Sequence, residues 1–203
     1  MRALLTLSGW IDGLSLFFGR IASWCILIVS LLAGADAILS YALVRLDRID
    51  LWLQANGVHI GFLLDWYRNN ANAVSDSLLL LFSMTVMLGA PWTLKVNEHV
   101  RVDLVYSMLT TRGKARLDIF GGLLFLLPMC VVMIGFTWPW FLASWHSGEM
   151  GASAGGLPRW PIKLMLPVGF FLLALQGISE LIKCWAALTT GYVREHVYEK
   201  PIQ

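Results

Sequence analysis

Four long stretches almost free of charged residues constrain this chain more than any other feature of its sequence. They run over residues 14–43, 77–94, 119–143 and 164–187. A helix that crosses a membrane needs about 20 mainly apolar residues, whereas the strands of a soluble core are much shorter. The pattern therefore predicts an all-α integral membrane protein, a single membrane domain over residues 1–203 with four transmembrane helices.

The composition also indicates a membrane protein and excludes several other classes of protein. Of the 203 residues, 58% are hydrophobic and 14% are charged, against about 25% charged residues in an ordinary soluble domain. The net charge of +2 gives no basic surface for nucleic acid, so we expect no nucleic-acid partner. The three cysteines are far apart and fit neither a disulfide framework nor a paired-cysteine metal site.

Lys and Arg are concentrated in the connections on one side of the predicted membrane helices, and this asymmetry predicts the orientation of the chain in the membrane. The connection between the second and third stretches holds five of them, Lys95, Arg101, Arg112, Lys114 and Arg116. The end of the fourth stretch and the tail after it add Lys183, Arg194 and Lys200. Because loops rich in Lys and Arg stay in the cytoplasm, we expect the middle loop and both termini there. Lys95, Arg112, Lys114 and Arg116 are candidate contacts for anionic lipid heads.

Two connections have apolar residues mixed with polar ones. Residues 50–67 are too interrupted to span a membrane, and we expect an interfacial helical segment on the outer side after the first span. Asn69 to Asn72 should end this segment before the second span. Residues 97–105 also have apolar residues mixed with polar ones, which predicts a second interfacial segment on the inner side.

Residues that carry chemistry are scarce within the spans. The four histidines lie outside the apolar stretches and no HExxH, P-loop or GxSxG pattern occurs, so we expect no enzyme activity, no cofactor and no metal. Asp36 lies within the first stretch. It is either a proton or cation site or a carboxylate hydrogen-bonded by a neighbouring helix. Glu180 is placed to pair with Lys183 one turn on.

Several motifs, in the same order along the chain, resemble the small membrane subunit of tripartite ATP-independent periplasmic (TRAP) transporters. The most specific is the polar cluster that follows the second span, Asn97, Glu98, His99, Val100, Arg101, Val102 and Asp103. Others are Leu88-Gly89-Ala90, Thr93-Leu94-Lys95, the run from Gly155 to Lys163 at the entry to the fourth span, Leu166 to Phe170, Leu175 to Gly177 and Glu180 to Lys183.

The resemblance implies a role in transport. A periplasmic solute-binding protein would deliver a carboxylate-bearing solute to a large membrane subunit, which moves it inward by an elevator motion coupled to sodium entry. The small four-helix subunit would be a scaffold partner of the large one in the bacterial inner membrane, in contact with membrane lipids. Candidate interface residues are Asn97, Glu98, His99, Arg101 and Asp103, where Arg101 and Asp103 would fix the inner loop.

The sequence departs from the family at the start of the second span. Many relatives have Glu at a position where this chain has Asp76. Asp caps a helix N-terminus well because its carboxylate accepts hydrogen bonds from free backbone N–H groups. We therefore expect Asp76 to cap the second span and add it to the candidate interface residues.

Two other functions remain open at this point. The chain could be a self-contained small proton-coupled carrier that uses Asp36. It could also be a membrane anchor of a redox complex. A haem-binding anchor would need histidines within or at the ends of facing helices, whereas the histidines of this chain lie outside the apolar stretches.

Overall fold

The structure is a computed structural model that describes residues 2–54, 62–96, 110–151 and 155–190. These residues form helices α1 (Arg2–Gln54), α2 (Phe62–Val96), α4 (Thr111–Gly121), α5 (Leu127–Ser147) and α6 (Trp160–Thr190), with a π-helical segment η1 (Gly122–Leu126) between α4 and α5. Across the described ranges the only β pairing is an isolated bridge between Met150 and Pro158. The expected all-α fold is confirmed.

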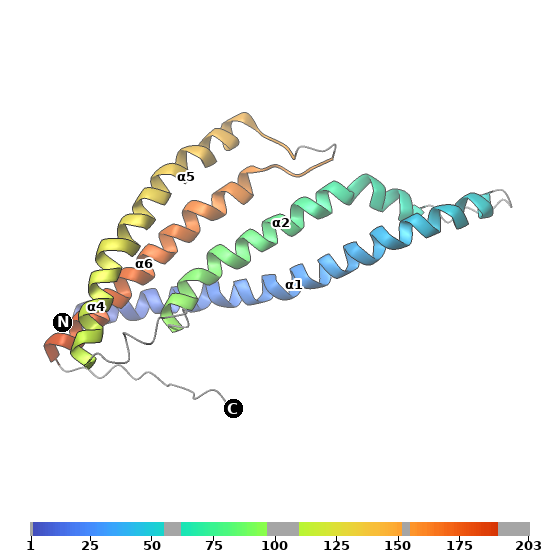
Figure 1. Cartoon of the computed structure of the whole chain (residues 1–203). Coiled ribbons are helices and arrows are strands. Elements are labelled where there is room, and N and C mark those ends of the chain that lie inside the picture. Colours follow the sequence, from blue (N-terminus) through green and yellow to red (C-terminus); the bar gives the residue numbers. More distant parts are fainter. Residues whose placement is uncertain (1, 55–61, 97–109, 152–154, 191–203) are drawn as a thin grey trace, which may run out of the picture.

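Four helical stretches are long and apolar enough to cross a membrane: Arg2–Ala42, Asn69–Val96, Arg112–Ser147 and Trp160–Thr189. The third combines α4, η1 and α5 into one rod (Figure 1). Each stretch contains all or nearly all of one predicted span and is longer than it. The difference arises because hydropathy marks the most apolar part of a helix, whereas backbone hydrogen bonding continues into its polar ends.

The expected outer interfacial helix is not confirmed. Residues 50–54 continue α1 and residues 62–67 begin α2, so the described part of this segment belongs to the two long helices. The expected break at Asn69 to Asn72 is wrong, because α2 is continuous through these residues. Asn70 stays helical while its side-chain amide donates to the carbonyl of Trp66 one turn earlier. The expected inner segment after Asn97 lies outside the described residues.

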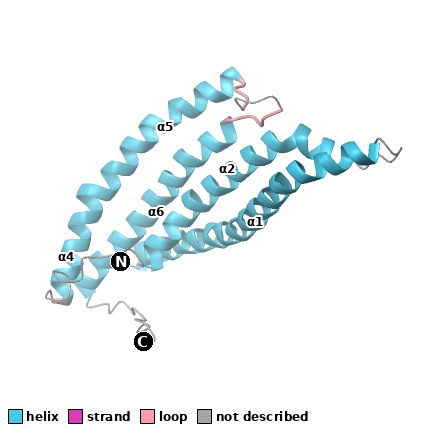
Figure 2. Cartoon of the chain, turned by 45° about the vertical axis from the view of Figure 1, so that its right-hand side comes forward, coloured by secondary structure: helices cyan, strands magenta, loops and turns pink. Residues whose placement is uncertain are grey.

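Helix α6 is the central element of the arrangement. It packs against α1, α2, α4 and α5, whereas α5 has its extensive contacts among the spans with α6 alone. In its most apolar stretch 39% of α6 is buried, against 17% or less in the other three spans. Figures 1 and 2 show the helices side by side from α5 through α6 and α2 to α1, with α5 and α6 diverging from α1 toward the end opposite the N-terminus, where α1 and α2 stay together.

The tightest packing lies where α1, α2 and α6 meet. Ala22, Leu88 and Leu172, one residue from each helix, form the buried cluster. A Cβ atom added to Gly169 of α6 would lie 2.6 Å from Cβ of Met87, and one added to Gly19 of α1 would lie 2.7 Å from the Trp92 ring. Real Cβ atoms do not approach this closely, so glycine at these two positions sets the spacing of the helices.

Candidate functional site

A polar network joins α1 to α6 near the N-terminal end of the chain. Lys183 of α6 is at its centre, with its ammonium 2.6 Å from a carboxylate oxygen of Asp12 on α1. The same ammonium lies 3.0 Å from a carboxylate oxygen of Glu180. Less than a fifth of each of these three side chains is exposed. The expected pair of Glu180 and Lys183 is therefore confirmed, and Asp12 is a partner that the sequence analysis missed.

Gln176 completes the centre of this network. Its side-chain amide donates to Asp12 Oδ1 and to Glu180 Oε1, both at 3.1 Å. Its carbonyl oxygen accepts a hydrogen bond of 2.6 Å from the Ser15 hydroxyl. The side chain of Gln176 is fully buried, so these bonds offset the cost of removing a polar amide from water.

Two further groups extend the network. The Ser179 hydroxyl donates to Asp12 Oδ1 over 2.9 Å and lies 2.7 Å from the Ser8 hydroxyl. Lys95 at the end of α2 donates to the backbone carbonyl of Asp12 at 3.3 Å. Lys95 was expected to contact lipid heads, and the structure places it beside α1. The network thus connects three helices, and the charges of Asp12 and Glu180 balance those of Lys95 and Lys183.

A signal for this network is present in the sequence. Ser8, Asp12 and Ser15 are separated by four and three residues, which places them on one face of a helix. The network residues of α6, namely Gln176, Ser179, Glu180 and Lys183, have the same helical spacing. Two polar stripes on separate apolar helices indicate that the stripes face each other. Asp12 was overlooked because it lies just before the apolar stretch that begins at Leu14.

A second polar contact joins α1 to α2 at the opposite end. The Tyr67 hydroxyl donates to Asp36 Oδ1 at 2.6 Å and lies 2.8 Å from the Ser40 hydroxyl. Tyr67 is buried, and the hydrogen bond to the Asp36 carboxylate raises its pKa above the ordinary value. Of the two readings of Asp36, the structure shows the carboxylate hydrogen-bonded by a neighbouring helix.

Asp76 occupies a different place from the one expected. Helix α2 begins at Phe62, so Asp76 lies well inside the helix and the expected N-terminal cap is wrong. Its carboxylate instead accepts a 2.8 Å hydrogen bond from the backbone N–H of Leu157, in the connection between α5 and α6. Asp76 thus fixes the loop between α5 and α6 to α2.

The loop from Gly148 to Arg159 is held by charge as well as by backbone. Glu149 accepts hydrogen bonds from Lys163 and from Ser144, and Arg159 lies 3.7 Å away. The hydrogen bond from Lys163, then that from Ser144, holds the pKa of Glu149 below its ordinary value. Lys163 also lies 4.6 Å from the Trp140 ring centre, which ties the loop to both flanking helices.

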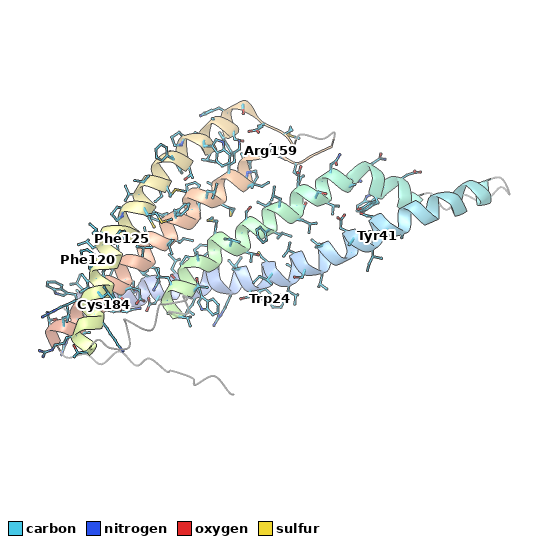
Figure 3. The ribbon with its side chains drawn as sticks, viewed as in Figure 1. Trp24, Tyr41, Phe120, Phe125, Arg159 and Cys184 are labelled. Carbon is cyan, nitrogen blue, oxygen red and sulfur yellow. The ribbon has the colours of Figure 1, made fainter. Side chains whose placement is uncertain are left out.

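Large apolar side chains cover the two edges of the arrangement. On α1 they include Trp10, Trp24, Leu31, Ile38 and Tyr41, and on α4, η1 and α5 they include Phe120, Leu123, Phe125, Val131 and Phe136, each more than half exposed. Figure 3 shows Trp24 and Tyr41 on α1 and Phe120 and Phe125 along the opposite edge. Such continuous apolar surfaces are typical of contact with lipid or with another membrane protein.

The remaining predicted residues fall into two groups. Arg112 and Arg116 are exposed on α4, and Lys114 on the same helix is partly buried. The members of the cluster after the second span, Asn97, Glu98, His99, Arg101 and Asp103, lie outside the described residues. Among the residues that the structure describes, no three His, Cys, Asp or Glu side chains gather as a metal site would require.

Comparison with known proteins places the chain in a family. The model of the family described as "Tripartite ATP-independent periplasmic transporters, DctQ component" matches residues 68–187, more than half of the chain. This range includes most of α2, all of α4, η1 and α5, and most of α6. No curated protein and no solved structure matches the chain. Four membrane-spanning helices and the family match together identify the chain as a multi-pass membrane protein of the DctQ family, the small permease subunit of a TRAP transporter.

Proposed function

We propose that this subunit is the fixed scaffold partner of a large membrane subunit in the bacterial inner membrane. A periplasmic solute-binding protein would deliver a carboxylate-bearing solute, and the large subunit would move it inward by an elevator motion coupled to sodium entry. The small subunit would bind no solute or ion. Its task would be to anchor the stationary part of the transporter while another part slides.

The contacts of the acidic groups are the observation that carries this proposal. Asp12 and Glu180 contact Lys183, Asp36 accepts from Tyr67, and Asp76 accepts from the Leu157 backbone. Apart from the pair of Glu180 and Lys183 within α6, these contacts join two helices or hold a loop to a helix. A carrier needs an acid that exchanges its partner during transport, whereas a scaffold needs acids that keep their partners.

The apolar edges support a partner of the same membrane. The described chain buries little of α1, α2 and α5 against itself, so a second membrane protein can cover one edge while lipid covers the other. Interfaces between membrane helices need close packing and not a hydrophobic drive. Gly135 on α5, which has open space where a side chain would be, suits such packing.

The positions of the charges support the proposed orientation. The N-terminus and α4 lie at the same end of the molecule (Figure 1), and α4 carries Arg112, Lys114 and Arg116. This basic end would face the cytoplasm. The loop held by Asp76 and Glu149 lies at the opposite end and would face the periplasm and the solute-binding protein.

Copurification tests the proposal directly. The tagged chain, expressed from its native genomic context, should purify with a larger multi-pass membrane protein, and its deletion should abolish sodium-dependent uptake of an organic acid. The Asp36→Asn variant should retain uptake, since a scaffold does not use this proton. If the tagged chain elutes alone and uptake survives the deletion, the proposal fails.

The cluster of residues 97–103 is proposed as part of the contact with the large subunit. Arg101→Ala should reduce the amount of large subunit that copurifies, because it removes a cation that would pair with Asp103 or with the partner. Arg101→Lys, which keeps the charge, should recover part of the yield. Equal recovery of the large subunit with all three chains would exclude this role for Arg101.

A further inference from the structure

A groove lined by apolar side chains lies where α1, α4, η1 and α6 approach one another near the N-terminal end. Its volume is about 310 Å³. The lining residues are Leu4, Ile119, Leu123, Ile178, Leu181, Ile182 and Trp185. One water occupies about 30 Å³ in the liquid, so the groove has room for a run of several methylene groups. A polar solute would find no side-chain hydrogen-bond partner there apart from the indole N–H of Trp185.

The π-helical segment contributes to the groove. Leu123 is the second residue of η1, where the helix is wider than an α-helix and its surface is locally displaced. Gly122 beside it allows close approach of α6, because a Cβ added there would lie 2.9 Å from Cδ2 of Leu181. One part of the wall, at Leu123, is therefore formed by a local departure from regular α-helix geometry.

Two arginines continue the same helix face beyond the end of the groove. Arg112, Arg116, Ile119 and Leu123 are separated by four, three and four residues, the spacing of a single stripe on a helix. With a rise of 1.5 Å per residue, Arg116 lies about 4.5 Å and Arg112 about 10 Å along the axis from Ile119. Both arginines are exposed, so their guanidinium groups are available at the polar end of the apolar lining.

We propose that this groove and these arginines form a binding site for one anionic phospholipid. An acyl chain lies between Leu123 and Trp185, and Arg116 and Arg112 hold the phosphate. The combination of an apolar slot with cations at one end matches an amphiphile with a negative head. A helix of a partner protein would fill the slot, but it would pair with both guanidinium groups only if acidic residues lay next to its apolar face. The site does not depend on the proposed scaffold role.

Photolabelling provides the test. The full chain, purified alone and together with any copurifying membrane protein, is reconstituted in nanodiscs of phosphatidylcholine. Each sample receives a small fraction of phosphatidylglycerol with a photoreactive group on its acyl chain. Peptides that contain Leu123 or Trp185 should carry the label. Unlabelled phosphatidylglycerol should compete, whereas phosphatidylcholine and inorganic phosphate should not.

Variants separate a specific site from general lipid contact. Arg112→Gln with Arg116→Gln should weaken labelling about 30-fold, since each basic residue near anionic lipid contributes about 1 kcal/mol, or about fivefold in affinity. Arg20→Gln, at another exposed arginine on α1, should not change it. Arg112→Lys with Arg116→Lys should keep most of the binding, which also controls for misfolding of the Gln variant.

Several outcomes would overturn the proposal. One is equal labelling of the Arg20→Gln and the double Gln variants, and another is labelling spread over all exposed apolar faces. A third is label that appears in the isolated chain and disappears when a partner protein is present, because the groove would then be a protein interface. Competition by inorganic phosphate would show a site for a free anion and not for a lipid.

Discussion

At the scale of single residues, Lys183 is the cation that brings two carboxylates together. Its ammonium contacts both Asp12 and Glu180, and each of these carboxylates also accepts from Gln176. Loss of one cation therefore leaves two acids of like charge near each other in an environment of low polarity. The cost of such a loss exceeds that of breaking an exposed pair.

Replacing Lys183 by Met should destabilise the subunit by about 3 kcal/mol, the lower end of the range for breaking a buried ion pair. In a chain of this size this corresponds to a fall in melting temperature of about 6 °C or more. Thermal unfolding in detergent measures it. Arg20→Gln is the control, and the double variant Asp12→Asn with Lys183→Met should recover part of the loss. A midpoint for Lys183→Met equal to that of the control would show that the ion pairs do not stabilise the fold.

Asp36 and Tyr67 give a second test at this scale. Asp36→Asn should leave stability nearly unchanged, because the amide oxygen of Asn also accepts from the Tyr67 hydroxyl. Tyr67→Phe should cost about 1 kcal/mol, since it removes the donor and leaves the Asp36 carboxylate with one partner fewer. Chemical unfolding of the two variants in parallel compares these values. A larger loss for Asp36→Asn than for Tyr67→Phe would contradict the view that this contact is a simple hydrogen bond.

The sequence could predict contacts between residues one turn apart, but not most contacts between helices. Glu180 and Lys183 could be paired from their spacing alone. Asp12 and Lys183 are separated by most of the chain, and their contact depends on which helices are neighbours. Asp76 shows the converse, because the end of an apolar stretch was taken for the end of a helix. The carboxylate was then assigned to backbone groups that are already bonded within α2.

At the scale of the elements, close approach between α2 and α6 depends on Gly169. Its replacement by Ala should destabilise the subunit by about 1–3 kcal/mol, the usual cost of overpacking, because Met87 would have to move. Gly135→Ala is the matched control: this helical position has open space, and Ala should be neutral or stabilising by up to about 1 kcal/mol. Melting temperatures of the two variants test this difference, because that of Gly169→Ala should fall and that of Gly135→Ala should stay the same or rise. Equal shifts would mean that Gly169 does not limit the packing.

The stability of the loop between α5 and α6 should depend on pH through Glu149. A pKa lower in the folded protein means that the folded state releases this proton more readily than the unfolded state. The contribution of Glu149 is therefore complete above about pH 4.5, its ordinary value, and is lost as the pH falls through the lower folded value.

Hydrogen exchange measures this loss at the amides of Gly151 and Arg159, which donate to Leu157 and Glu149 backbone carbonyls. After correction for intrinsic rates, their protection should be high at pH 7 and fall in acid. In Glu149→Gln the protection should be lower at pH 7 and nearly independent of pH in this range. Undiminished protection of the natural chain at pH 3 would show that the ionised Glu149 carboxylate does not stabilise this loop.

Hydropathy predicted the helices themselves but not the residues at which they begin and end. The four apolar stretches were each found within a longer helix, since an apolar run of this length has no stable alternative in lipid. Helix α1 has 53 residues and is about 80 Å long, well beyond the roughly 30 Å of a hydrocarbon core. No composition rule marks where such a helix stops, because backbone hydrogen bonding continues beyond its apolar stretch.

At the scale of the whole molecule, the subunit is an open array and not a closed bundle. Four spans and a family could be recognised from sequence motifs, because motifs are local. The order of the helices across the array could not be predicted, because every span is apolar on most of its surface and its sequence does not indicate which side faces a neighbouring helix. The polar stripes on α1 and α6 are the exception, and they identify the one pair of helices that the sequence could have placed together.

The arrangement of α5 also bears on how the chain is made. Helices α1 and α2 are consecutive and are extensive partners, so they can insert and pair as a hairpin while synthesis continues. Helix α5 leaves the ribosome with its one extensive partner among the spans, α6, still to come. For the time needed to translate residues 148–190, α5 must therefore remain in the lipid, or at the insertion machinery, without its native neighbour. A chain truncated after Ser147 should keep the α1–α2 hairpin but be degraded from its α5 end, which makes completion of α6 the step that commits the subunit to its final form.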